Sequence, residues 1–133
     1  MTATAESPMT VRPPTSRSII TLVLRLEALA LAIAAIAAYR AFEGSWGLYF
    51  AVWLAPDLAM LGYIWGSRVG ALCYNTTHAL IGPFALTALG VITADTLLTQ
   101  LGLVWISHVG IDRVLGYGLK YRDGFHHTHF TRT

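Results

Sequence analysis

Four apolar stretches dominate the sequence, and each is about as long as a helix that crosses a lipid bilayer. They cover residues 19–42, 46–65, 69–93 and 96–117, and roughly 20 predominantly apolar residues are enough to span the hydrocarbon core. The connections between them are very short, so consecutive helices must run antiparallel. We therefore predict an all-α integral membrane domain, a four-helix bundle with up-down-up-down topology.

The composition supports a membrane protein and excludes several other classes. Hydrophobic residues make up 55% of the 133 residues and charged residues only 12%, about half the charged share of a typical soluble domain. The formal net charge of +2 is small, and no basic stripe with interleaved aromatic residues is present, so we expect no nucleic-acid partner. Cys73 is the single cysteine of the chain, which excludes an internal disulfide.

Both ends of the chain are polar, and their positive charge predicts the orientation in the membrane. We expect a disordered tail at residues 1–18, the helical domain at 19–117 and a second tail at 118–133. With four spans, both tails and the second connection share one side of the bilayer, and only Arg40 lies on the other side. Excess positive charge marks the cytoplasmic side, so both termini are predicted to be cytoplasmic. The positive residues on that side are Arg12, Arg17, Arg68, Lys120, Arg122 and Arg132.

One ionisable group in each stretch lies at a similar depth. Counted from the cytoplasmic end of its stretch, Glu27 lies about eight residues in, which is roughly 12 Å along a helix. Asp57, His78 and His108 lie about nine residues in, or roughly 14 Å. A charged residue near the centre of a spanning helix costs roughly 2.5–3.5 kcal/mol, so such groups face the bundle interior. We predict that these four groups meet in one buried layer.

A second polar layer is expected nearer the cytoplasm, and together the two layers suit a metal. Asp112 lies four residues after His108, and Asn75 lies three residues before His78, so each pair shares one helix face. Two imidazoles with two or more carboxylates are typical ligands of a divalent metal, zinc or iron in particular. We predict metal ligation by His78, His108, Asp112 and Asp57.

These groups favour a metal-dependent membrane enzyme, hydrolytic or oxidative, over two alternatives. The predicted catalytic residues are Asp57, Glu27 as a proton shuttle, and Arg25 beside it. Because the site would be reached from the membrane, we expect an apolar small molecule or a lipid as substrate. One alternative is a proton- or ion-coupled transport component, and the other is a structural polar core without catalysis. No strict catalytic motif is present to decide among them.

Smaller features bear on the same site. Pro56 and Pro83 adjoin the predicted layer, and each can kink its helix because proline lacks a backbone N–H. The alanine-rich first stretch would allow close helix contacts in a homo-oligomer. The polar tail carries three histidines that could bind metal or remain solvated. They are His126, His127 and His129. Aromatic residues such as Trp53, Tyr74 and Trp105 are interpreted as packing residues or interfacial anchors.

The sequence resembles a family of small bacterial integral membrane proteins that is known only as a domain of unknown function. Three runs carry the resemblance: LRLEALAL, WLAPDLAMLGYIWGSRVGALCYNTTHAL and HVGIDRVLGYGLKYRDGFHHTHF. The likeness covers about Leu22 to His129, and DRVLGYGLKY is its quite specific core. It implies a four-helix fold in the bacterial inner membrane and no particular activity. The family's tail looks more like GFKDTHL, so His126 and His127 depart from it.

Overall fold

The computed structural model describes residues 16–118, and this part of the chain is all-α. Within it, five α-helices and one 3-10 helix follow one another: α1 (Ser16–Ala41), α2 (Trp46–Val52), η1 (Ala55–Trp65), α3 (Ser67–His78), α4 (Ile81–Ile92) and α5 (Thr96–Leu115). The three tail histidines and most of the two predicted tails lie outside the described residues.

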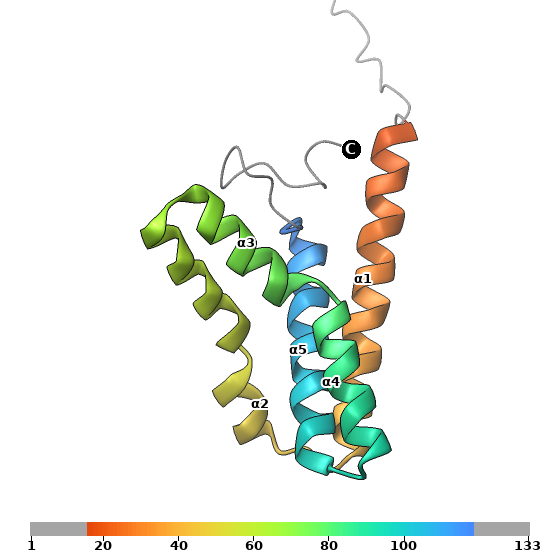
Figure 1. Cartoon of the computed structure of the whole chain (residues 1–133). Helices are drawn as coiled ribbons and strands as arrows, with labels where there is room; N and C mark the ends of the chain where they lie inside the picture. The colour runs from red at the N-terminus through yellow and green to blue at the C-terminus, as the bar shows by residue number, and fades with distance from the viewer. Residues whose placement is uncertain (1–15, 119–133) are drawn as a thin grey trace, which may run out of the picture.

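Helix α5 lies at the centre of the packing (Figure 1). It packs closely against α1 and α4 and touches α2, whereas η1 and α3 pack against each other as a hairpin. The connections after α1 and after α4 lie at one end of the molecule, where the Gln100 side chain donates to the Phe42 carbonyl at 2.8 Å. The end of α5 and the η1–α3 turn lie toward the opposite end. Helix α5 accordingly has the longest buried run, residues 106–110.

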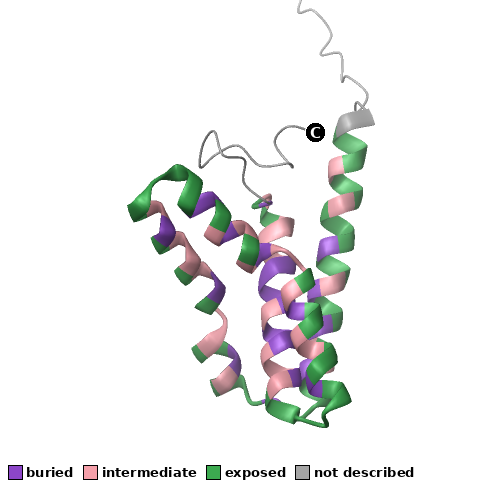
Figure 2. Cartoon of the chain, in the orientation of Figure 1, coloured by how far each residue is buried: buried purple, intermediate pink, exposed green. Residues whose placement is uncertain are grey.

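Small side chains let α1 approach α5 closely. The buried face of α1 is formed by Ala28, Ala32, Ala35 and Tyr39, which recur at helical spacing. Opposite them is Gly110, where an added Cβ would lie 3.0 Å from the Ala32 Cβ. Figure 2 shows purple bands on the side of α1 that faces α5, while its outer side is green. This close approach fixes which side of α1 points inward.

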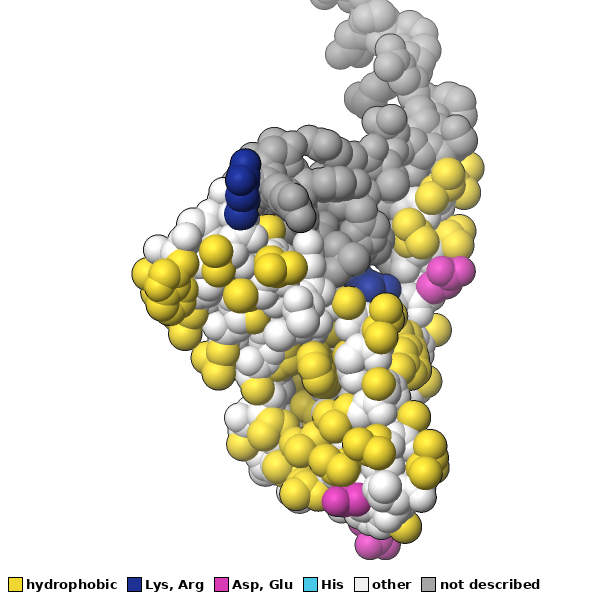
Figure 3. Space-filling model, viewed as in Figure 1, with side chains coloured by type: hydrophobic (Ala, Val, Ile, Leu, Met, Phe, Trp, Pro, Cys, Tyr) yellow, Lys and Arg dark blue, Asp and Glu magenta, His cyan; other side chains and the backbone are white. Residues whose placement is uncertain are grey.

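The outer surface of the described chain is largely apolar, as expected when lipid is the solvent. Three stretches are long and apolar enough to cross a membrane, Ser18–Ala41, Trp46–Trp65 and Ser67–Ile92. In each of them only 17% of the most apolar window is buried inside the protein. Figure 3 shows hydrophobic side chains spread over the face formed by α4 and its neighbours. The fourth predicted span forms α5, which is more deeply buried and carries polar site residues.

Two of the predicted helices are each broken in the middle. The second stretch changes after Val52 from an α-helix to the 3-10 helix η1, and the third is interrupted by the extended residue Ala79. Pro56 and Pro83 lie just after these breaks, at the positions where the sequence analysis expects each proline to kink its helix. A proline ring clashes with the preceding turn and donates no hydrogen bond, which explains both interruptions.

Candidate metal centre

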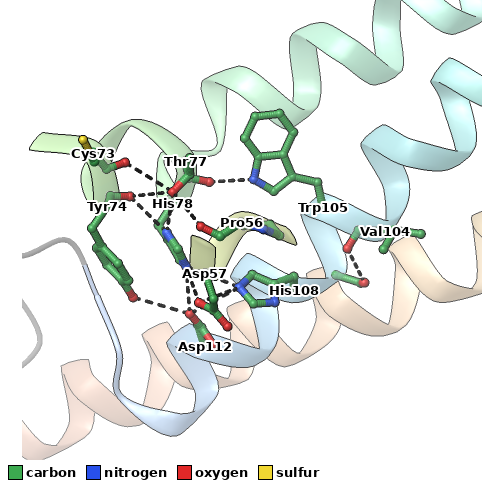
Figure 4. Close-up of polar contacts among 11 residues, drawn as sticks. Pro56, Asp57, Cys73, Tyr74, Thr77, His78, Val104, Trp105, His108 and Asp112 are labelled. Atoms are coloured by element: carbon green, nitrogen blue, oxygen red, sulfur yellow. Dashed lines mark hydrogen bonds and ion pairs between the residues drawn. The ribbon is translucent and has the colours of Figure 1, made fainter. Parts of the chain in front are cut away.

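Four of the predicted ligands meet in the interior. Asp57 comes from the first turn of η1, His78 from the last residue of α3, and His108 from the middle of α5. Asp112 follows His108 by one helical turn and reaches the same point. One ligand atom from each of these residues lies within 4.8 Å of the others (Figure 4). Asp57 follows the first helix interruption and His78 directly precedes the second, so the two interruptions lie next to the site and position these ligands.

The distances between these ligand atoms are short and nearly equal. The two imidazole Nε2 atoms lie 3.3 Å apart. Asp57 Oδ1 lies 3.3 Å from His78 Nε2 and 3.4 Å from His108 Nε2. Asp112 Oδ2 lies 3.2 Å from His78 Nε2 and 3.7 Å from His108 Nε2. The four ligand atoms thus surround one common point.

This spacing matches a tetrahedral metal site. Ligand atoms bound tetrahedrally at 2.0–2.1 Å, the range for zinc with imidazole, lie about 3.3–3.4 Å from one another. The five distances above run from 3.2 to 3.7 Å. Hydrogen bonds alone would not require both carboxylates to lie this close to both imidazoles, since each imidazole needs only one partner at Nε2.

The charges of the cluster also call for a cation. Within residues 16–118 the only ion-pair partners of Asp57 and Asp112 are the two imidazoles. Both histidines are almost fully buried, with 3% and 1% of their side chains exposed, and Asp112 is 14% exposed. With both imidazoles neutral, the two carboxylates carry a net negative charge, which is costly to bury without a counter-ion. A divalent metal would neutralise it.

Contacts behind His78 direct its Nε2 toward this centre. Its Nδ1 lies 3.0 Å from the Tyr74 carbonyl and 2.9 Å from Thr77 Oγ1. A carbonyl only accepts hydrogen bonds, so the bond to Tyr74 needs a proton on Nδ1, and in the neutral tautomer with that proton Nε2 keeps its lone pair. The Tyr74 ring stacks on the imidazole at 3.8 Å with an angle of 11°. Such outer contacts orient the metal-binding histidines of known centres.

Thr77 and Trp105 connect the three elements that supply the ligands. Thr77 Oγ1 lies 3.2 Å from the Pro56 carbonyl in η1, and Trp105 Nε1 donates to the Thr77 carbonyl at 2.6 Å. The Trp53 ring meets the His108 imidazole edge-on at 5.0 Å. The sequence analysis had interpreted these aromatic residues as packing or interfacial residues. For Tyr74, the i, i+4 spacing from His78 is the sequence signal that could have indicated its contact with the imidazole. For Trp53 and Trp105 the sequence carries no such signal.

A protein-family model described as a domain of unknown function, DUF4260, matches residues 21–133. The chain belongs to the DUF4260 family. This match confirms the resemblance to a family of unknown function. No curated protein and no solved structure matches the chain. The functional interpretation of this DUF4260 protein therefore depends on the site itself.

Two predicted site residues lie outside this centre of the DUF4260 chain. Glu27 is exposed on α1, so its placement in the buried layer is wrong. The reason is that α1 presents Ala28 and Ala32 to α5, which leaves the neighbouring Glu27 on the outer side. Arg25 is exposed as well, and its guanidinium lies near Gly116 at the end of α5. Asp112, predicted as a ligand from a layer just nearer the cytoplasm, lies in the same cluster as the other three ligands.

Proposed function

We propose that this DUF4260 protein is a metalloprotein of the bacterial inner membrane that binds one divalent transition metal. The metal is held by His78, His108, Asp57 and Asp112. The surrounding bundle crosses the membrane four times in up-down-up-down order, with both termini in the cytoplasm. The observation that carries the proposal is the near-equal spacing of the four ligand atoms, 3.2–3.7 Å for the five distances given above.

The ligand set favours zinc or iron over other metals. Imidazole nitrogen suits zinc and iron, whereas magnesium and calcium prefer oxygen ligands alone. The mixture of two nitrogens and two oxygens around one point also favours a single metal. Two metals in a shared site lie roughly 3.5–4 Å apart and need additional bridging ligands. Four ligand atoms within 4.8 Å enclose space for one ion.

The proposed activity is metal-dependent chemistry, hydrolytic or oxidative, on an apolar or lipid-like substrate. Catalytic zinc sites keep one coordination position open, whereas structural sites are closed by four protein ligands. Asp57 is the ligand best suited to open a coordination position on the metal. Its side chain is 35% exposed, and it lies in the first turn of the 3-10 helix that follows the end of α2. The metal would supply Lewis acidity or redox chemistry at that position. The three remaining ligands would hold it in place.

Elemental analysis of the detergent-purified full-length protein tests the metal site. The purification tag must contain no histidine. We expect about one zinc or iron per chain in the wild type, since the four ligands suit one ion, and at least a tenfold lower content in His78→Ala and in His108→Ala. A triple alanine variant of the tail histidines is the matched control and keeps its metal. Wild-type protein with no more metal than the two ligand variants, after expression in metal-rich medium, would refute the proposal. A structural polar core or a proton-coupled transport component would then be the better interpretation.

A further inference from the structure

A pocket lined by apolar side chains lies beside the metal ligands. It is formed where the α2–η1 break meets α4 and α5, and its volume is about 250 Å³. An engineered apolar cavity of about 150 Å³ is large enough to bind benzene. The lining residues are Val52, Ala55, Pro56, Leu86, Leu101, Val104 and Trp105. The space is therefore sufficient for a hydrocarbon group larger than one benzene ring.

Two residues that line the pocket are close neighbours of proposed metal ligands in the sequence. Pro56 directly precedes Asp57, and Val104 lies one helical turn before His108 on the same face. From Leu101 to His108 the helix rises by roughly 10 Å. A ligand's hydrocarbon chain that lay in the pocket along α5 would thus have one end near the proposed metal position.

The lining offers almost no polar group to a ligand. The indole N–H of Trp105 already donates to the Thr77 carbonyl at 2.6 Å, and the Pro56 carbonyl is 3.2 Å from Thr77 Oγ1. Burial of apolar surface is then the main source of affinity, which favours a hydrocarbon chain over a polar ligand. Three stretches of the protein are suited to a lipid environment, where such chains are abundant.

Trp53 supplies the polar contact that a substrate head group would need. In the sequence it lies between Val52 and Ala55, which line the pocket, and its ring, which is not part of the lining, meets His108 at 5.0 Å. Its Nε1 is buried and has no acceptor within the part of the chain that the structure describes. Buried donors without a partner are rare in proteins and call for an explanation. Because this nitrogen is closed to solvent, a ligand oxygen would accept its hydrogen bond after a movement of the Trp53 ring.

We propose that the pocket binds the acyl or alkyl chain of a lipid-like substrate, with its oxygen-bearing head group at the metal and at Trp53 Nε1. The end of the acyl or alkyl chain that is farther from the metal lies toward Leu101. This inference rests on the proposed function, because the head group is placed by the metal.

Photolabelling directly tests whether the pocket binds an acyl chain. The probe is a diazirine-bearing palmitic acid, added to full-length protein in phosphatidylcholine nanodiscs. We expect saturable labelling of peptides that contain Val52–Pro56, Leu86 and Leu101–Trp105. Leu86→Trp and Ala55→Trp fill the pocket and lower this labelling at least fivefold. Leu89→Trp is the matched control, because Leu89 is exposed on α4 and does not line the pocket.

A second pair of measurements tests the head group. Trp53→Phe keeps the ring but removes the N–H, so we expect at least a threefold higher half-saturating probe concentration with unchanged metal content. Removing the metal from wild-type protein with a chelator should have a similar or larger effect.

The outcomes separate this inference from the proposed function because metal content is measured in every sample. Acyl-chain binding in the pocket is overturned if metal-loaded protein shows labelling that does not saturate, or labelling that is the same in wild type and both pocket variants. The proposed metal site is then unaffected. Saturable labelling that responds to neither chelation nor Trp53→Phe overturns the head-group placement. Wild-type protein without metal refutes the proposed function itself.

Discussion

Thr77 is the single residue whose contacts connect most of the metal centre. Its hydroxyl lies 2.9 Å from His78 Nδ1 and 3.2 Å from the Pro56 carbonyl, and its own carbonyl accepts from Trp105. None of these contacts is made by one of the four candidate ligand atoms. Thr77 therefore offers a test of whether the protein orients its ligands through the residues behind them.

We expect Thr77→Val to weaken metal binding about tenfold, the lower end of the range for outer contacts of metal-binding histidines. The effect is limited because the Tyr74 carbonyl remains as an acceptor for His78 Nδ1. Competitive titration with a chelating dye measures the affinity. Thr76→Val is the control, since Thr76 is exposed and, among residues 16–118, its hydroxyl bonds only to the Leu72 carbonyl 2.8 Å away. Equal losses in both variants would contradict an orienting role for Thr77.

At the scale of the helices, glycine determines how closely α4 and α5 pack. A Cβ at Gly102 would lie 2.7 Å from the Thr87 backbone nitrogen and 2.9 Å from its Cα. Backbone atoms cannot rotate away as a side chain can, so the two helices would have to separate. By contrast, a Cβ at Gly47 in α2 would meet nothing within 4 Å.

Gly102→Ala should therefore lower the free energy of unfolding by about 1–3 kcal/mol, the usual cost of overpacking. Gly47→Ala should leave it unchanged or raise it by up to about 1 kcal/mol, because alanine favours helix over glycine. Thermal unfolding in detergent, followed by circular dichroism, measures both variants. A Gly102→Ala protein as stable as Gly47→Ala would show that α4 and α5 are not in the close contact described.

At the scale of the whole molecule, the metal centre joins two separately packed parts. Helix α5 packs closely on α1 and α4, whereas η1 packs chiefly on α3. His108 and Asp112 belong to the first part, and Asp57 and His78 belong to the η1–α3 hairpin. A bound metal would therefore hold the hairpin against α5.

Removing the metal should loosen the hairpin more than the rest of the molecule. A metal at 100 times its dissociation constant stabilises the folded state by about 2.7 kcal/mol, and this contribution is lost on chelation. Hydrogen–deuterium exchange should then increase in residues 55–78 and change little in α1 and α4. In His108→Ala the chelator should have no effect. A uniform increase along the chain would contradict the two-part arrangement.

The orientation in the membrane is also a property of the whole molecule. The positive charges near the ends of the chain predict that reporter fusions at Thr133 and at Gly66, just before Arg68, are both cytoplasmic. Fusions at Gly44 and Ala94, in the two connections at the other end, should be periplasmic. A periplasmic result at Thr133 or Gly66 would overturn the topology.

The sequence by itself determined the helical class, the apolar stretches and the identity of the four candidate ligands. It could do so because an ionisable group in an apolar helix is costly, so Asp57, His78, His108 and Asp112 stand out, and depth along a helix can be counted from residue numbers. Rotation about the helix axis cannot be counted in this way. Only tertiary packing decided it, since the contact of Ala28 and Ala32 with Gly110 turns Glu27 outward. The contacts of Trp53 with His108 and of Thr77 with Pro56 likewise follow from how the helices meet, because residues far apart in the chain make them.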